Sequence, residues 1–392
     1  MLEPNALRTH SSVTVSAVTI PQPAVLQRWQ ELHQSLSDAY KAGDTASLAS
    51  YAIYSQCVSQ VFGQEQDAAF AQHLFSQLTE QLRLSAASDW PSQQLDKACA
   101  LAWLQARLPH GLVTAAPVLL TELDHALAGE ARRLLQQPGA ASRPNFLRAL
   151  RYFSLRLPTP AASQQLQHLL SQQVEASAAT SPAEQLPLGL ASGLAAEMLL
   201  LIKLSKAGIR SELLNHRIQA GVLLLLSVKR DVDFLEQRYS VFPYQMPAHA
   251  RCATFSAELS WSHGDVGQAL MLYEAQDLLQ DAELAKIAEL VGLNTLLRTT
   301  TPATGIVSSY FYEGAAGVAH LYRKLHVLSG QPAYWRGYQF WLDQTQYWLG
   351  QELTADSPPH RGTELVAGLA GVGLVLLTAL STAELDWDAV LL

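Results

Sequence analysis

Four segments in the C-terminal half of the chain share one plan, in which small residues, glycines among them, run directly into an apolar helix. They read GLASGLAAEMLLLIKL from Gly189, GDVGQALMLYEAQDLL from Gly264, GAAGVAHLYRKLHVL from Gly314 and GLAGVGLVLLTAL from Gly368. Their glycines at 264, 314 and 368 are separated by 50 and 54 residues, which suits a pair of helices with its connections. Glycine at a helix start lets backbones approach closely and leaves amide groups facing a common centre. The repeat therefore predicts several helix starts around one cavity, although close helix packing alone also explains a single Gly-x-x-Gly.

The rest of the chain also has the periodicity of helices. Stretches such as LQRWQELHQSLSDAYKAG, LTELDHALAGEARRLLQQ and WLDQTQYWLG repeat apolar residues at three- and four-residue steps, and alternating strands are scarce. Apolar residues make up 49% of the sequence and charged residues 15%, which predicts helices that are buried on more than one side. The interruptions are short, at residues 157–163, 179–187, 240–251, 299–305 and 354–362. We therefore expect an all-α chain that forms a single domain, 1–392, with residues 1–24 as an irregular N-terminal segment.

Charge, hydropathy and cysteine content argue against several classes of partner and of location. The net charge is −8 with no cluster of Lys and Arg, which argues against a nucleic-acid or anionic-membrane partner. The longest uncharged stretch, LVAGLAGVGLVLLTALSTA, only approaches the roughly 20 apolar residues of a membrane span, so we expect a buried helix there. The start MLEPNALRTH has an early acid and no apolar core, so we expect no secretory signal. Cys57, Cys99 and Cys252 form no C-x-x-C pair, which predicts neither a disulfide framework nor a cysteine zinc site and fits a cytoplasmic protein.

Residues 258–270, ELSWSHGDVGQAL, gather side chains that can carry chemistry. Ser262, His263 and Asp265 surround a glycine at the start of a predicted helix. A positioned imidazole and carboxylate can exchange protons with a substrate, so these residues are candidates for acid/base catalysis. They also suit a structural role, because Asp at a helix N-terminus can cap the helix and interacts favourably with its dipole. The residues alone leave both interpretations open.

Four segments resemble, in this order, the lanthionine synthetase C-like (LanC) family. They are LSWSHGDVGQAL, YEGAAGVAHLYRKL, GLAGVGLVLLTAL and the terminal WDAVLL. The resemblance covers roughly the last 210 residues well, and the N-terminal half in its helical rhythm. It implies an α/α toroid of about seven inner and seven outer helices. It also implies a role in cyclising precursor peptides, since members of the family add a Cys thiol to a dehydrated Ser or Thr.

This chain differs from the family where relatives bind zinc. In active relatives the present WSHGD reads WCYGD and the present YEG reads CHG, and those two Cys and one His hold the metal. Their places are taken here by Ser262, Tyr312 and Glu313. A catalytic zinc needs about three protein ligands and an open position for the substrate thiol, and neither a Ser hydroxyl nor a Tyr phenol supplies an anion near pH 7. Even with His263 recruited beside Glu313 the set is one ligand short, so we expect no zinc and no other cofactor.

Two further positions that the resemblance singles out have also changed. Ser192, in GLASG, stands where relatives carry the His thought to handle the proton during thiol addition, and an unactivated serine is a poor general acid at pH 7. Glu258 stands where the family has an Arg four residues before the first zinc Cys, which reverses the local charge. Asp124, in LDHALAG, is a weak local match to a family Asp near the site. Trp261 and Tyr312 are expected to fill with aromatic bulk the space that a metal leaves.

The sequence therefore predicts a toroid with the shape of the family but without its zinc chemistry. The leading hypothesis is a non-catalytic pseudo-cyclase that binds a precursor peptide or a lanthipeptide dehydratase. The alternative is a zinc-independent cyclase that adds Cys thiols to dehydrated Ser or Thr, with His263, Asp265 and Glu313 as acid/base groups. A third hypothesis, a carbohydrate-active toroid, needs Asp265 and Glu313 about 5–10 Å apart across the cavity, and the resemblance makes it the weakest of the three.

Overall fold

The computed structural model describes ten stretches of the chain, and helices dominate them. The stretches are residues 22–44, 47–84, 92–108, 116–136, 142–178, 186–209, 211–236, 238–246, 253–355 and 362–392. The β pairing in this part of the chain consists of two isolated antiparallel bridges, Pro187 with Gln245 and Asp233 with Arg238. The expected all-α class is therefore confirmed.

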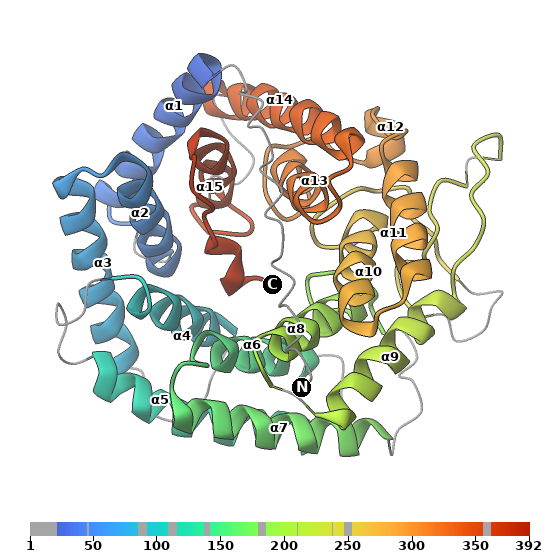
Figure 1. The fold of residues 1–392 in the computed structure, drawn as a ribbon. Coiled ribbons are helices and arrows are strands. Elements are labelled where there is room, and N and C mark those ends of the chain that lie inside the picture. The colour runs from blue at the N-terminus through green and yellow to red at the C-terminus, as the bar shows by residue number, and fades with distance from the viewer. Residues whose placement is uncertain are drawn as a thin grey trace, which may run out of the picture.

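The helices form two concentric rings, with the chain alternating between an outer and an inner helix (Figure 1). The inner ring consists of α2 (Leu48–Phe62), α4 (Ser92–Gln105), α6 (Ser142–Leu155), α8 (Leu194–Lys206), α10 (Asp265–Leu279), α13 (Ala315–Ser329) and α15 (Leu369–Leu380). The outer ring consists of α1 (Gln22–Lys41), α3 (Glu65–Leu84), α5 (Ala116–Gln136), α7 (Pro160–Ala178), α9 (Glu212–Ser227), α11 (Ala282–Thr295) and α14 (Pro332–Thr354). The described part of the chain also contains two short elements, α12 (Thr301–Thr304) and the 3₁₀ helix η2 (Trp387–Val390).

The inner ring closes on itself, because each inner helix packs against the next and α15 packs against α2. The described chain is thus an α/α toroid with seven inner and seven outer helices, as expected. Helix α12 lies inside the connection predicted at 299–305. Helix α1 begins at Gln22, so the last three residues of the segment predicted to be irregular are helical, while residues 1–21 lie outside the described part.

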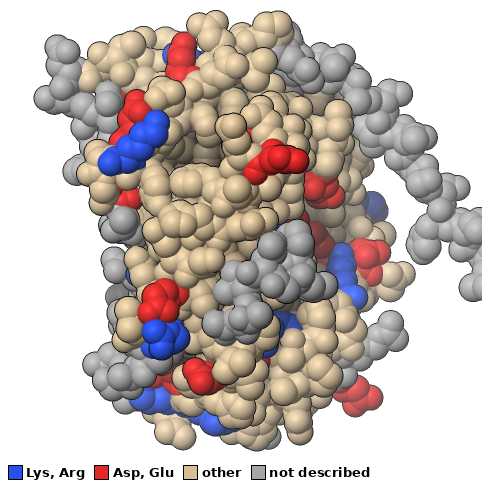
Figure 2. Space-filling model, turned by 90° about the vertical axis from the view of Figure 1, so that its left-hand side faces the viewer, with Lys and Arg blue, Asp and Glu red and all other residues tan. Residues whose placement is uncertain are grey.

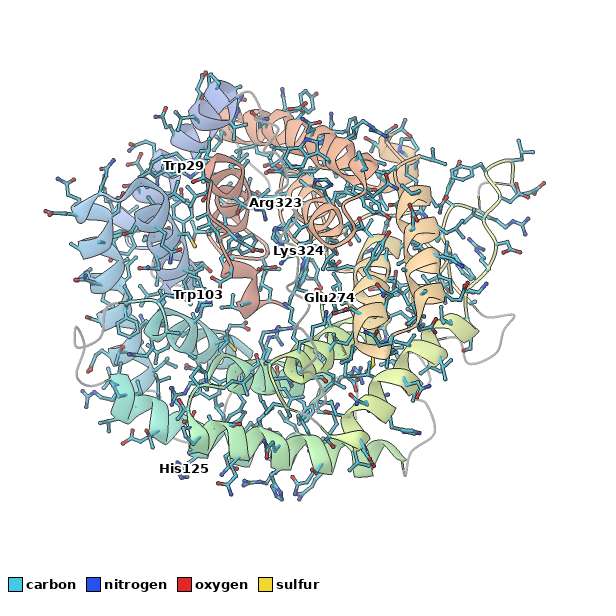
Figure 3. The ribbon with its side chains drawn as sticks, in the orientation of Figure 1. Trp29, Trp103, His125, Glu274, Arg323 and Lys324 are labelled. Atoms are coloured by element: carbon cyan, nitrogen blue, oxygen red, sulfur yellow. The ribbon has the colours of Figure 1, made fainter. Side chains whose placement is uncertain are left out.

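The sequence pattern explains which helices lie inside. On the outer helix α5, buried residues such as Leu120, Leu123 and Leu127 recur at three- and four-residue steps, and His125 lies on its outer side (Figure 3). On the inner helix α8, residues 194–202 are all buried, because an inner helix has protein on both sides. Helix α15 is likewise buried along most of its length, which confirms the buried helix predicted for its uncharged stretch. In the described part of the chain, no helix combines the length and apolar character needed to cross a bilayer.

The C-terminal residues lie in the middle of the ring (Figure 1). Trp387 of η2 is fully buried, and Asp388 accepts a hydrogen bond from His320 at 3.1 Å and pairs with Lys324 at 2.6 Å. Burial alone would raise the pKa of Asp388, but the Lys324 charge and the His320 hydrogen bond hold it well below its usual value. The last turn is thereby tied to α13, whose Lys324 lies near the centre of the ring (Figure 3).

Acidic and basic side chains are mixed over the face of the molecule that Figure 2 shows. Small groups of both signs lie among a majority of uncharged residues there, so no broad field of one sign covers the described part of that face.

Candidate functional site

The loops before four inner helices occupy equivalent places in the ring. Each loop ends in the glycine that precedes its helix, Gly193, Gly264, Gly314 or Gly368. Two residues before these glycines stand Ala191, Ser262, Tyr312 and Val366. Three of the positions that the family uses, 192, 262 and 312, therefore lie on neighbouring loops at one end of the toroid.

Single backbone hydrogen bonds join these loops in order around the ring. The amide of Ala191 donates to the carbonyl of Ser262 at 3.1 Å, and the amide of Ser262 donates to the carbonyl of Tyr312 at 3.2 Å. The amide of Tyr312 donates in turn to the carbonyl of Val366 at 3.0 Å. We call this series the loop relay. It fixes the main chain at positions 191, 262, 312 and 366 independently of their side chains.

The glycines allow the loops to approach this closely. A β-carbon at Gly189 would overlap the carbonyl of Ser262 and lie 2.7 Å from the Cα of His263. A β-carbon at Gly317, in the first turn of α13, would lie 2.7 Å from the Cβ of Trp261. Gly264 has φ of 101°, a conformation that L side chains rarely adopt. The glycine-rich motif is therefore explained by close contacts between repeats.

A chain of side-chain hydrogen bonds crosses the loop before α10. His263 Nδ1 lies 2.7 Å from Ser262 Oγ, and His263 Nε2 lies 2.9 Å from Glu258 Oε2. Ser262 is 4% exposed, whereas the side chains of His263 and Glu258 are 14% and 58% exposed. The Tyr244 ring meets the imidazole edge-on, with the ring centroids 5.1 Å apart. This series of hydrogen bonds thus runs from a buried hydroxyl to a carboxylate in contact with solvent.

Tyr312 lies on the other side of Ser262. Burial raises the pKa of its phenol, the nearby Glu313 carboxylate raises it further, and a hydrogen bond with Ser262 acts in the opposite direction. The phenol therefore keeps its proton at neutral pH. Its ring also contacts Trp261, with centroids 6.1 Å apart, so aromatic bulk lies beside the Ser262 position. Glu313 itself is exposed.

Ser192 and Asp265 lie close to this chain in sequence but have different surroundings. Ser192 follows Ala191 of the loop relay, and its carbonyl accepts a hydrogen bond from Arg143 at 3.2 Å. The Asp265 carboxylate is 1% exposed and pairs with Arg298 at 2.5 Å. It also accepts hydrogen bonds from the amides of Val241 and Phe242, at 3.0 and 3.1 Å. Asp265 therefore fixes the segment that leads to Tyr244, and its oxygens already have these partners.

Asp124 lies on the outer helix α5 and faces α6. Its carboxylate accepts a hydrogen bond from the Tyr152 hydroxyl at 2.7 Å and pairs with Arg156 at 2.9 Å. Asp124 is 3% exposed, so the pair is buried between the two helices. The structure brings together Glu258, Ser262, His263 and Tyr312. The partners of Asp124 are instead Tyr152 of α6 and Arg156, the residue directly after α6.

The side chains present do not fit the zinc that the resemblance implies. Zinc prefers thiolate, imidazole and carboxylate ligands, about three of them in a catalytic site. The hydroxyl of Ser262 and the protonated phenol of Tyr312 are not such ligands, and both nitrogens of His263 face other side chains. Among the described residues, no three His, Cys, Asp or Glu side chains are close enough to share one metal ion.

Two residues of the site were missed by the sequence interpretation. Ser260 accepts a hydrogen bond from the amide of His263 and donates to its carbonyl, both at 3.0 Å, and it lies 3.0 Å from Ser262 Oγ. Arg298 is fully buried and belongs to a different segment from its partner Asp265. The S-W-S spacing could have indicated Ser260, whereas no local signal marks Arg298, because its contact spans 33 residues of sequence.

The fold and these linked helix starts define an α/α toroid of the LanC type. The family model described as "Lanthionine synthetase C-like protein" matches residues 30–392. The chain belongs to this lanthionine synthetase C-like family, and the match includes most of the N-terminal half. Among solved structures, nisin cyclase is similar, with a TM-score of 0.74 and 14% sequence identity, over 92% of this chain and 96% of that chain. No curated protein is significantly similar to this chain.

Proposed function

We propose that this LanC-like protein is a pseudo-cyclase, which binds a lanthipeptide precursor peptide without carrying out zinc-dependent ring closure. The observation that carries the proposal is the pairing of a retained scaffold with replaced chemistry. The loop relay and its glycine contacts keep the geometry of the helix starts. At the first zinc-ligand position of the family stands Ser262, which contacts His263, and His263 in turn contacts Glu258. A thiol entering this site meets no metal ligand set that would lower its pKa.

A groove beside the loop relay supports peptide binding. It has a volume of about 960 Å³ and is lined by α1, the end of α14 and the start of α15. Ligand sites in proteins commonly have volumes of about 300–1,000 Å³. Thr363 and Leu369, which flank Val366 of the relay, belong to its lining, together with charged groups such as Arg28 and Asp38. The groove offers apolar contacts and both signs of charge to an extended chain.

Calorimetric titration with a co-encoded precursor peptide, dehydrated and undehydrated, tests the proposal. We expect saturable binding of at least one form and no gain of rings by mass spectrometry. Ser35→Trp would fill the groove and weaken binding, whereas Ser171→Trp, at an exposed serine on α7, would leave binding unchanged. Absence of binding to every co-encoded peptide overturns the proposal, and affinity for a co-encoded dehydratase alone would assign the scaffold role to that partner instead.

A second candidate function rests on the His263–Glu258 contact. An imidazole held by a carboxylate can act as a general base, and proton transfer of this kind contributes roughly 10²–10⁴ in rate. The protein would then be a zinc-independent cyclase in which His263 takes the proton of the attacking thiol. Dehydrated peptide would gain rings with the wild-type protein and lose that gain with His263→Ala. Equal ring formation with and without protein excludes this candidate.

A further inference from the structure

The hydrogen bonds around His263 have a defined direction. A carboxylate only accepts hydrogen bonds, so the contact of 2.9 Å with Glu258 places the imidazole proton on Nε2. Nδ1 then carries the free lone pair, and it faces Ser262 Oγ at 2.7 Å. The imidazole is therefore oriented as a base toward the hydroxyl of Ser262.

The neighbouring hydroxyls bear on where the Ser262 proton goes. Ser260 has one proton, which it donates to the carbonyl of His263, while its oxygen accepts from the amide of His263. Ser260 Oγ could also accept from Ser262, at 3.0 Å, but the contact with Nδ1 is shorter at 2.7 Å. With Nδ1 as an acceptor, the Ser262 hydroxyl donates to Nδ1. Tyr312 interacts with the same hydroxyl from the other side, and a phenol can donate to an oxygen there.

We propose that Ser262 is a serine nucleophile for acyl transfer, with His263 as its general base and Glu258 as the residue that positions the imidazole. The substrate class is a carboxylic ester. This is the arrangement of nucleophile, base and orienting acid that defines a catalytic triad by geometry rather than by sequence order. The inference goes beyond the proposed function and does not rest on peptide binding.

The reaction balances with water as the second substrate. Ser262 Oγ forms a bond to the acyl carbon as its proton passes to His263 Nδ1, and the bond to the leaving alkoxide breaks as His263 returns that proton to it. Water then attacks the acyl-serine in the same way, which releases the carboxylic acid and restores the hydroxyl.

The site is rigid in the way such chemistry requires. The carbonyl of Ser262 accepts from Ala191 and its amide donates to Tyr312, so the nucleophile is held from both sides by the loop relay. The backbone of His263 is held by Ser260 in turn. The nucleophile and the base are thus kept in contact without help from a ligand.

A fluorophosphonate probe and p-nitrophenyl butyrate, applied to the purified full chain, test the inference. We expect the probe to add to Ser262, as located by peptide mass mapping, and the ester to be hydrolysed. Ser262→Ala would abolish both, and His263→Ala would slow hydrolysis by about 10²–10⁴. Glu258→Gln would lower kcat by more than about tenfold while KM stays unchanged, which a purely structural role would not produce. The control variant Ser171→Ala, at an exposed serine far from the site in sequence, would take up the probe and hydrolyse the ester as the wild type does.

Two results overturn the inference. One is wild-type protein that carries no probe on Ser262. This result needs no variant, so it holds even if a variant fails to fold. The other is folded Ser262→Ala protein, checked by its melting curve, that hydrolyses the ester as fast as the wild type. These assays use small esters and no peptide. A protein that neither takes up the probe nor hydrolyses the ester can therefore still bind the peptide, and a protein that binds no peptide can still hydrolyse the ester.

Discussion

Replacing Gly317 by alanine tests whether the glycine motif exists for contact between repeats. In an ordinary helix, exchange of glycine for alanine stabilises by about 0.8–1.0 kcal/mol. At Gly317 the new β-carbon would lie 2.7 Å from the Cβ of Trp261 and overlap the carbonyl of Phe311, whereas carbons normally approach to about 3.5–4.0 Å. Overpacking of this kind costs about 1–3 kcal/mol, and the loop relay limits relaxation. Because one of the overlapping atoms belongs to the backbone, we place the cost in the upper half of that range, about 2–3 kcal/mol, which leaves a net loss of about 1–2 kcal/mol in the free energy of unfolding.

The matched control is Gly129→Ala on the outer helix α5. Gly129 is exposed, and nothing lies within 4 Å of a β-carbon built there. The same chemical change should therefore stabilise the protein by about 0.5–1 kcal/mol. Urea unfolding followed by far-UV circular dichroism measures both variants. The reasoning is refuted if Gly317→Ala is as stable as the wild type or more stable, because the close contact would then carry no energetic consequence.

Three further perturbations have defined outcomes. Arg298→Met leaves the buried Asp265 carboxylate without its cation, so urea unfolding should show a loss of about 3–5 kcal/mol, and a change below about 1 kcal/mol would contradict the pairing. Burial raises the pKa of Cys57 far above its usual value and that of Cys99 to about 12, so neither thiol should react with iodoacetamide at pH 8 until urea unfolds the chain; mass mapping that finds either one alkylated in native protein would contradict this. The depressed pKa of Asp388 contributes stability above about pH 4 that is lost as pH falls below the unfolded value; melting temperatures against pH should drop there, and Asp388→Asn should be less stable at pH 7 but show a shallower drop.

The fold could be predicted because its signal is repeated and local. Glycine followed by an apolar helix recurs at the starts of α8, α10, α13 and α15, and each recurrence marks the same place in the ring. Outer helices were recognisable from one-sided apolar spacing, as on α5. Both signals lie within single helices and their first residues, so they can be recognised without knowing which segments of the chain contact one another in the fold.

The site was only partly predictable, because its contacts depend on how loops fold. Asp265 reads as an acid at a helix start, yet its partner Arg298 comes from beyond the next helix. The carboxylate that meets His263 is Glu258, five residues earlier, since the turn between them brings the two side chains together. Asp124 matched a short motif, but it lies on the outer helix α5, and its partners are Tyr152 of α6 and Arg156 directly after α6. Local spacing contains none of this information.

The loop relay uses amides and carbonyls alone, and that separates shape from chemistry in this protein. Mutations at residues 191, 262, 312 and 366 can exchange a sulfur, a hydroxyl or a ring without breaking any of the bonds that join neighbouring repeats. At each position the side chain can therefore change while the backbone contacts between repeats persist. A lineage with such backbone contacts can lose one reaction and acquire another without passing through an unfolded ancestor.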